Sequence, residues 1–132
     1  MLFLYKEGDI IKKNEFKIGE KIYTADKIGW EYQLQEGDKA GRGDDGSMFH
    51  DVVGILKKVY YDFIDYRDED GTSELINLLA QTDAMVTYYD IKEKEFVTKS
   101  MYVSGDKIEA SLIDDEFYAN PFQLRFTANK VE

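Results

Sequence analysis

Cysteine is absent from this chain of 132 residues, and proline and histidine each occur once. Without cysteine the chain can hold no disulfide framework, no thiolate metal site and no cysteine nucleophile. It must be held together by packing or by partners, and it suits a reducing cytoplasm. Since Pro121 is the single proline and no low-complexity linker is visible, we expect a single domain over residues 1–132.

Long hydrophobic runs are also missing. The opening MLFLYKEGD reaches Lys6 and Glu7 after only a few apolar residues. Such a run is too short for a signal peptide and far too short for a membrane span. We therefore expect neither secretion nor a membrane partner.

Basic residues are scarce, because 17 Lys and Arg oppose 27 Asp and Glu, for a formal net charge of −10. Binding to a nucleic-acid backbone depends on a basic surface, so we expect no sequence-specific nucleic-acid binding. Carboxylates gather at 62–74 and 109–116. They predict either solvated turns or a wall that repels phosphate. A DNA mimic would need a regular carboxylate array, which the lysines spread through residues 6–39 disfavour.

No catalytic constellation stands out in the sequence. Ser47 and Asp51 lie near His50, but neighbouring positions on a strand point to opposite faces. The nucleophile-elbow pattern of hydrolases is absent, as are a phosphate loop, a dinucleotide fingerprint and zinc-ligand spacing. We predict no catalytic residue and no cofactor, with His50 at a surface or an interface.

Two Asp- and Gly-containing loops, at 43–46 and 68–71, have some of the composition of calcium loops. Neither has the alternating spacing that lets several oxygens converge on one ion. Turn formation by Asp and Gly explains both loops without a metal. The RGD tripeptide at 42–44 matches an adhesion motif, but a match of three residues arises easily by chance. We predict no metal site and no adhesive role.

Aromatic residues are plentiful, at 14% of the chain with ten Tyr and eight Phe. They favour β-structure, because rings pack well on a pleated surface. Near the end of the chain Phe122, Leu124, Phe126 and Ala128 alternate with polar residues, which predicts the inward face of a strand. Strands are predicted at 2–6, at 15–23 with a turn at 19–20, and at 30–35, 51–66, 84–89, 95–104, 107–112 and 117–129.

The most unusual stretch is an extended Gly/Asp-rich loop at 37–48 that leads into the long run at 51–66. As one strand this run would span about 50 Å, so it either bends at Gly54 or extends beyond the core. A short helix is predicted at 73–81, with Thr72 or Asp70 as its cap. This order of elements predicts a mainly β fold, either a β-sandwich or a rolled sheet, with one short α-helix.

Several short motifs follow one another along the chain. GDDGSMFHD at 43–51 precedes the long strand, a helix ending in LL at 78–79 follows it, and MYVSGD comes at 101–106. With these motifs residues 41–129 resemble the small tail proteins of siphophages, myophages and prophages of Gram-positive bacteria. The positions that carry the resemblance are Met48, His50, Asp51, Thr98, Met101, Tyr102, Val103, Gly105 and Asp106.

The resemblance implies a tail-tube-like structural subunit of a bacteriophage tail, in its tube, tip or baseplate. Such a subunit is made in the bacterial host cytoplasm and ends in the virion, where it joins copies of itself in a ring and other phage tail proteins. The implied inter-subunit contacts are Arg42, Asp44, Asp45, Met48, His50, Tyr60, Tyr61 and Phe63. The acids that would face a DNA channel are Asp62, Asp65, Asp68, Glu69 and Asp70.

Two alternatives stay open at this point. A head–tail connector or a capsid-decorating protein shares most of these features and belongs to the same class of virion parts. A small-ligand-binding β-barrel is of another class, and its cavity would be lined by the many Tyr side chains.

Overall fold

The computed structural model describes residues 11–36, 41–42, 48–49, 52–79 and 81–132. Its elements in chain order are β1 (Glu15–Ile18), β2 (Lys21–Thr24), β3 (Lys27–Glu36), β4 (Gly41–Arg42), β5 (Met48–Phe49), β6 (Val52–Phe63), α1 (Glu69–Leu78), β7 (Ala84–Asp90), β8 (Glu95–Gly105), β9 (Ala110–Ile113), β10 (Glu116–Ala119) and β11 (Phe122–Ala128). The fold is thus mainly β with one short helix, as predicted. The strand predicted at 2–6 lies outside the described residues.

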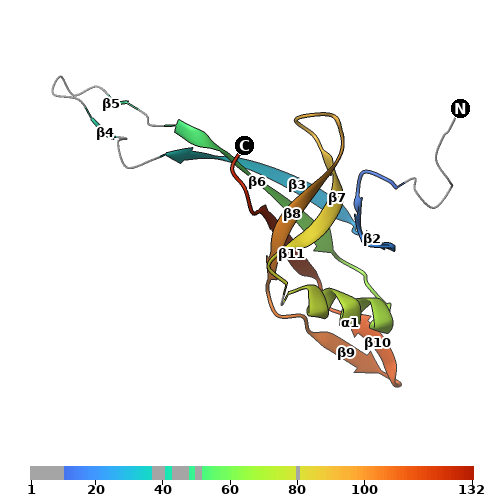
Figure 1. Cartoon of the computed structure of the whole chain (residues 1–132). Helices are drawn as coiled ribbons and strands as arrows, with labels where there is room; N and C mark the ends of the chain where they lie inside the picture. Colours follow the sequence, from blue (N-terminus) through green and yellow to red (C-terminus); the bar gives the residue numbers. More distant parts are fainter. Residues whose placement is uncertain (1–10, 37–40, 43–47, 50–51, 80) are drawn as a thin grey trace, which may run out of the picture.

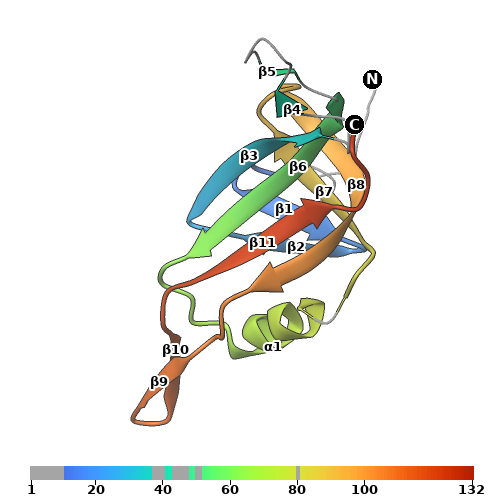
Figure 2. The same ribbon diagram turned by 90° about the vertical axis from the view of Figure 1, so that its left-hand side faces the viewer.

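Seven strands form one antiparallel sheet in the order β2-β1-β7-β8-β11-β6-β3 (Figures 1 and 2). The turn between β1 and β2 falls where the sequence predicts it, and Gly19 there has a φ of 61°, a conformation that glycine adopts without steric cost. The predicted hairpin of β7 and β8 is also present, paired from Ala84↔Met101 to Asp90↔Glu95.

The sheet is rolled, because side chains of its last strand reach its third. Trp30 on β3 donates from Nε1 to the carbonyl oxygen of Tyr89, at the end of β7, over 2.7 Å. Tyr32, two residues further along β3, donates to the carboxylate of Asp90 over 2.5 Å. Between β3 and β7 the sheet order interposes β6, β11 and β8. The sheet therefore curls until its two halves meet. Of the two predicted alternatives, the described strands form the rolled sheet.

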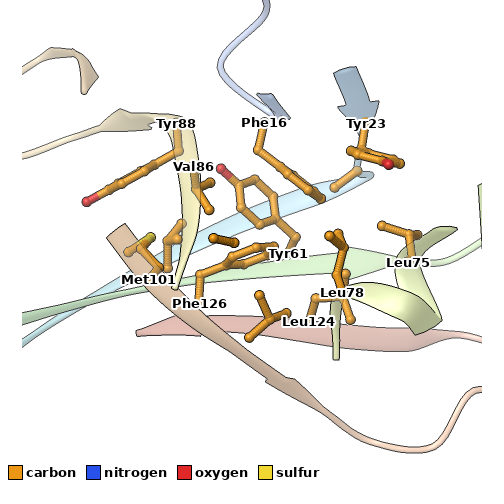
Figure 3. Packing of buried hydrophobic residues seen from close by; sticks show 14 of the residues in the cluster. Phe16, Tyr23, Tyr61, Leu75, Leu78, Val86, Tyr88, Met101, Leu124 and Phe126 are labelled. Carbon is orange, nitrogen blue, oxygen red and sulfur yellow. The ribbon is translucent and has the colours of Figure 1, made fainter. Parts of the chain in front are cut away.

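The core lies inside this roll and is built from alternate residues of the strands (Figure 3). The Phe16 ring lies 4.5 Å from that of Tyr61 and 4.9 Å from that of Phe126, measured between ring centroids. Leu75 and Leu78 of α1 are buried in the same cluster. The helix therefore closes one end of the roll with the apolar side chains that a helix of ten residues must bury to be stable.

The helix begins earlier than predicted, at Glu69 instead of residue 73, and ends at Leu78. Its N-cap is Asp68, whose carboxylate accepts from the backbone N–H of Gly71 over 3.0 Å. The predicted caps Asp70 and Thr72 both lie inside the first turn. The carboxylate of Asp68 satisfies an amide that has no partner within the helix, and this sets the boundary.

Two hairpins project from the roll. The first is an arm, since β6 pairs with β11 only from Lys58 to Phe63, whereas its pairing with β3 continues to Val52. The short pair β4–β5 lies at the far end of this arm (Figure 1). The long run of the sequence thus extends beyond the core, which is one of the two predicted possibilities.

The second projecting hairpin is β9–β10, beside α1 at the other end of the molecule (Figure 2). The sequence predicts one strand at 117–129, but the chain divides there into β10 and β11 with Pro121 between them. Since proline lacks the N–H that a ladder needs, it fits the break between the two strands. Among the described residues no helix is long and apolar enough to cross a membrane.

Candidate functional site

The predicted contact residues fall into three groups in the structure. Arg42 and Met48 are partners in the β4–β5 pair at the far end of the arm. Asp44, Asp45 and His50 lie outside the described residues. The remaining three lie on β6, where the alternation of the strand separates them.

Tyr61 and Phe63 belong to the core, with exposed fractions of 0% and 1%. Neither side chain can present a surface to a neighbouring subunit, so both are withdrawn from the contact set. Tyr60 points to the other face of the same strand, and its hydroxyl donates to the carboxylate of Glu31 on β3. The run around residue 60 is apolar at odd and even positions alike, so the sequence pattern could not tell which face is buried.

The predicted channel acids gather around the start of α1. Asp62 accepts a hydrogen bond from the side chain of Gln123 over 2.7 Å. Asp65 pairs with Arg67 over 3.1 Å at an exposed site, and Asp68 caps the helix. Glu69 and Asp70 occupy the first turn of α1, where the positive end of the helix dipole favours carboxylates. Hydrogen bonding, ion pairing and the helix dipole thus give several of these carboxylates a local structural role.

Most of the net negative charge of the chain lies at this end of the molecule. The segments 64–79 and 106–120 hold ten carboxylates against Arg67 and Lys107, a net charge of −8 out of −10 for the whole chain. Both segments lie together in Figure 2, as the loop and α1 on one side and the β9–β10 hairpin on the other. We refer to these two segments as the acidic end.

Both outer edges of the rolled sheet are open among the described strands. β2 pairs only with β1, and β3 pairs only with β6. Each edge strand also carries a large apolar side chain on the surface, Ile22 on β2 and Leu34 on β3, with exposed fractions of 37% and 50%. An edge strand offers unpaired N–H and C=O groups to another strand, so both edges can accept a neighbouring chain.

A buried ion pair connects the root of the arm, meaning the part of β6 next to the roll, to the end of strand β7. The ammonium of Lys57 lies 2.9 Å from the carboxylate of Asp90, and the two side chains have exposed fractions of 6% and 0%. Tyr32 donates to the other oxygen of the same carboxylate. In the sequence Lys57 looks like an interruption of an apolar strand. Its role becomes visible only when the sheet order places Asp90 opposite it.

The three groups shift one another's ionisation. Burial alone would raise the pKa of Asp90, but the hydrogen bonds from Tyr32 and Lys57 and the charge of the ammonium outweigh it and lower that pKa. Burial alone would lower the pKa of Lys57, but the hydrogen bond to Asp90 and the surrounding carboxylates raise it. Burial and the hydrogen bond to Asp90 raise the pKa of Tyr32 to about 12. The cluster is therefore charged as a pair over the neutral range.

The last residue of the sequence, Glu132, also binds to the root of the arm. The backbone of Glu132 makes two hydrogen bonds with Ile55, of 2.7 and 2.9 Å, on the edge of β6 that β11 leaves free. The side chain of Glu132 reaches Lys99 over 2.7 Å and Lys57 over 3.5 Å. The hydrogen bond from Lys99 lowers the pKa of Glu132. Sequence reasoning missed this contact, because no local pattern links the two segments.

Nothing in the described interior resembles a ligand cavity. The inside of the roll is filled by aromatic rings, with Phe63 and Phe122 stacked at 4.8 Å and Tyr61 and Phe126 edge to face at 5.7 Å between centroids. A surface depression of about 450 Å³ lies between β8 and the residues after β11. Among the described residues no group of three or more His, Asp or Glu side chains is placed to hold a metal ion.

Comparison with known proteins finds no match to a family model and no match among curated proteins. A solved structure does match in fold. It is a chain described as "Virion of native gene transfer agent (GTA) particle", with a TM-score of 0.54 and 9% sequence identity over 92% of this chain and 95% of that chain. At this identity the match shows a shared fold, and it covers nearly the whole length of both chains.

Proposed function

We propose that this chain is a structural subunit of the virion of a bacteriophage or phage-like particle, and that it acts by assembly without catalytic turnover. The observation that carries the proposal is the fold shared with a gene transfer agent virion chain over 92% of this chain and 95% of that one. The resemblance of the motifs at 43–51 and 101–106 to those of tail proteins supports the same class and favours a position in the tail.

Assembly would proceed by strand addition at the open edges of the sheet. The β3 edge of one copy would pair with the β2 edge of the next, which satisfies backbone groups and covers Leu34 and Ile22 together. Because the two edges differ, this contact is heterologous, and its repetition closes into a ring when the rotation between copies divides a full turn. The arm of β3 and β6, with Arg42 and Met48 near its far end, would add contacts to a neighbouring copy or another tail protein.

The interior of the roll supports assembly over ligand binding. A small-ligand barrel needs a cavity of about 300–1,000 Å³, and here aromatic rings fill the described interior. If the acidic end faces the ring's lumen, its carboxylates would keep the DNA backbone from adhering, because binding requires basic counter-charge. DNA would then pass through the ring as cargo.

The test uses the natural absence of cysteine. Ile22→Cys and Leu34→Cys are prepared as two single variants, mixed at high concentration and treated with a short bis-maleimide. A covalent dimer that needs both variants supports edge-to-edge pairing. Mixing Ile22→Cys with Met85→Cys is the control, since Met85 is 56% exposed on β7, which lies at neither edge of the sheet. Electron microscopy of the unmodified chain then separates stacked tubes, expected for a tail tube, from single rings, expected for a connector. A monomer at every concentration, with no cross-link, would contradict the proposal.

A further inference from the structure

The β9–β10 hairpin exposes apolar side chains that no described residue covers. All four residues of β9 are exposed, and Leu112 and Ile113 have exposed fractions of 68% and 60%. An isolated two-stranded hairpin is only marginally stable in water, and large exposed aliphatic side chains favour association. Yet this hairpin stands free beside α1 (Figure 2).

The hairpin is nonetheless held in a defined shape. Asp114 and Asp115 have φ angles of 52° and 66°, and both lie between the paired residues Ile113 and Glu116. A two-residue loop with positive φ at both positions is the geometry of a type I′ turn, whose twist suits a tight hairpin. The apolar side chains are thus presented on an ordered projection.

The base of the hairpin is tied to the roll. The backbone N–H of Ala119 donates to the carbonyl oxygen of Tyr66 over 3.0 Å. The guanidinium of Arg67 lies over the ring of Tyr118, 4.9 Å from its centroid. These contacts fix the direction in which the tip projects, while the tip itself stays uncovered.

The charge of the hairpin limits the kind of surface to which it can bind. Glu109, Asp114, Asp115 and Glu116 fall within residues 108–120, and no Lys or Arg does. An apolar tip surrounded by carboxylates calls for a surface that is apolar in its middle and basic at its rim, because complementary charge guides and orients association.

Such a surface lies elsewhere on the same chain. The depression of about 450 Å³ is lined by Thr98, Lys99, Ser100, Ala128, Lys130, Val131 and Glu132. Val131, 38% exposed, supplies apolar contact, and Lys130 supplies positive charge, whereas Lys99 is already paired with Glu132 over 2.7 Å. Its volume falls within the range of small-molecule sites, which is sufficient for one aliphatic side chain. In both views the C-terminal residues lie far from the hairpin (Figures 1 and 2).

We propose that the β9–β10 hairpin of one copy of this chain docks into the Lys99–Lys130 depression of a second copy. Leu112 would enter the depression beside Val131, with the carboxylates of the Asp114–Asp115 turn meeting Lys130 at its rim. Because the two surfaces lie far apart on the molecule, the contact is head-to-tail and can repeat without limit. It rests on the proposed assembly function and adds to it an axis of growth that is separate from the sheet edges.

The test is again a pair of single cysteine variants, Leu112→Cys and Val131→Cys, mixed and oxidised under mild conditions. A disulfide-linked dimer that requires both variants is expected, and its yield should fall as salt is raised because exposed charges are screened. Lys130→Cys serves as a second acceptor, so that the result does not depend on the packing of Val131. Leu112→Cys mixed with Met85→Cys is the matched control.

The other outcomes each overturn the inference. Leu112→Cys that links to itself shows a symmetric tip-to-tip contact. Equal yields with Met85→Cys show random collision. If the hairpin variants fail to link while Ile22→Cys and Leu34→Cys still do, only this inference fails. If neither pair links and the chain stays monomeric, the proposed function fails with it.

Discussion

The ammonium of Lys57 on β6 lies 2.9 Å from the carboxylate of Asp90 on β7, and both side chains are almost completely buried. Two strands, β11 and β8, separate β6 from β7 in the sheet order. This contact therefore spans the inside of the roll and ties the base of the projecting arm to the opposite wall. It is the interaction on which the orientation of the arm depends.

Replacing Asp90 with Asn should destabilise the fold by about 3 kcal/mol. Removing one partner of a buried pair leaves the other charge without full compensation, and here Glu132 at 3.5 Å and Glu93 at 3.8 Å compensate only in part. Urea unfolding of the two proteins measures the difference. Asp65→Asn is the control, since the pair of Asp65 with Arg67 is exposed and should contribute less than about 1 kcal/mol. Equal effects of the two substitutions would show that burial of the Lys57 pair contributes nothing.

Stability should fall at both ends of the pH scale for identifiable reasons. The pKa values of Asp90 and Glu132 are lowered by folding, so their contribution is complete above the unfolded value of about 4 and is lost as pH falls through the folded values. The pKa of Tyr32 is raised to about 12, so its contribution is complete below about 10 and is lost as pH rises through 12. The raised pKa of Lys57 acts in the same alkaline direction.

The measurement is the free energy of unfolding against pH for the wild type, Asp90→Asn and Glu132→Gln. The acid loss should be smaller in each variant than in the wild type, because each has one fewer carboxylate to protonate. An acid loss that stays the same in both variants would assign it to other groups.

Tyr61→Phe should leave stability unchanged or raise it by up to about 1 kcal/mol. The hydroxyl of Tyr61 is fully buried with no hydrogen-bond partner in the described structure, and burying an unpaired hydroxyl is unfavourable. Tyr32→Phe is the matched comparison, since its hydroxyl donates to Asp90, and it should cost about 1–2 kcal/mol. Thermal unfolding of both variants decides the matter. A clear loss in Tyr61→Phe would reveal a partner for that hydroxyl.

Asp68→Ala should cost about 1 kcal/mol, because it removes the carboxylate that accepts from the N–H of Gly71. Asp70→Ala should cost about 0.3–0.5 kcal/mol, since Asp70 acts only through the helix dipole. Helix content by circular dichroism and urea unfolding provide the two readouts. A larger loss in Asp70→Ala than in Asp68→Ala would indicate that Asp70, one of the two caps predicted from the sequence, is the N-cap.

Helix α1 shows which features of the fold can be predicted from the sequence alone. Its apolar stripe predicts a helix near residue 75 correctly, since that pattern is local. The start differs by four residues, because Asp68, Asp70 and Thr72 are all capable caps and the sequence does not show which of them accepts from a free backbone N–H. The same holds for the strand around Tyr60 and Tyr61, where both faces read as apolar and only the sheet order decides which one is buried.

The candidate contact surfaces were predictable to a smaller extent. The length of the run at 51–66 predicts that it either bends or extends beyond the core, and the pairing of β6 shows the second, while most of the predicted loop at 37–48 lies outside the described residues. The pairing of Lys57 with Asp90 could not be predicted, since it requires the order of strands in the roll. Exposure of Leu112 was equally hidden, because Lys107–Leu112 resembles any half-buried strand until β9 is seen to stand apart from the main sheet.

Gly54→Ala should destabilise the arm by about 1–3 kcal/mol. Gly54 has a φ of 157°, and a Cβ there would lie 2.5 Å from the Cγ1 atom of Val131 and 2.6 Å from the carbonyl oxygen of Glu132. The added methyl group must therefore displace the residues that seal the arm root against Ile55 and Lys99. Gly29→Ala is the matched control on the neighbouring strand β3, because its Cβ would meet only the Cβ of Tyr60 at an ordinary 3.8 Å.

The double variant Gly54→Ala with Val131→Ala separates the two clashes. It removes the contact with the side chain and keeps the one with the backbone oxygen, so recovery should be partial. Urea unfolding gives the energies, and hydrogen exchange at the amide of Ile55, which donates to Glu132 over 2.7 Å, reports whether the seal has opened. Faster exchange at Ile55 in Gly54→Ala but not in Gly29→Ala is the expected result. Unchanged exchange in both would mean that the last residues do not depend on the glycine.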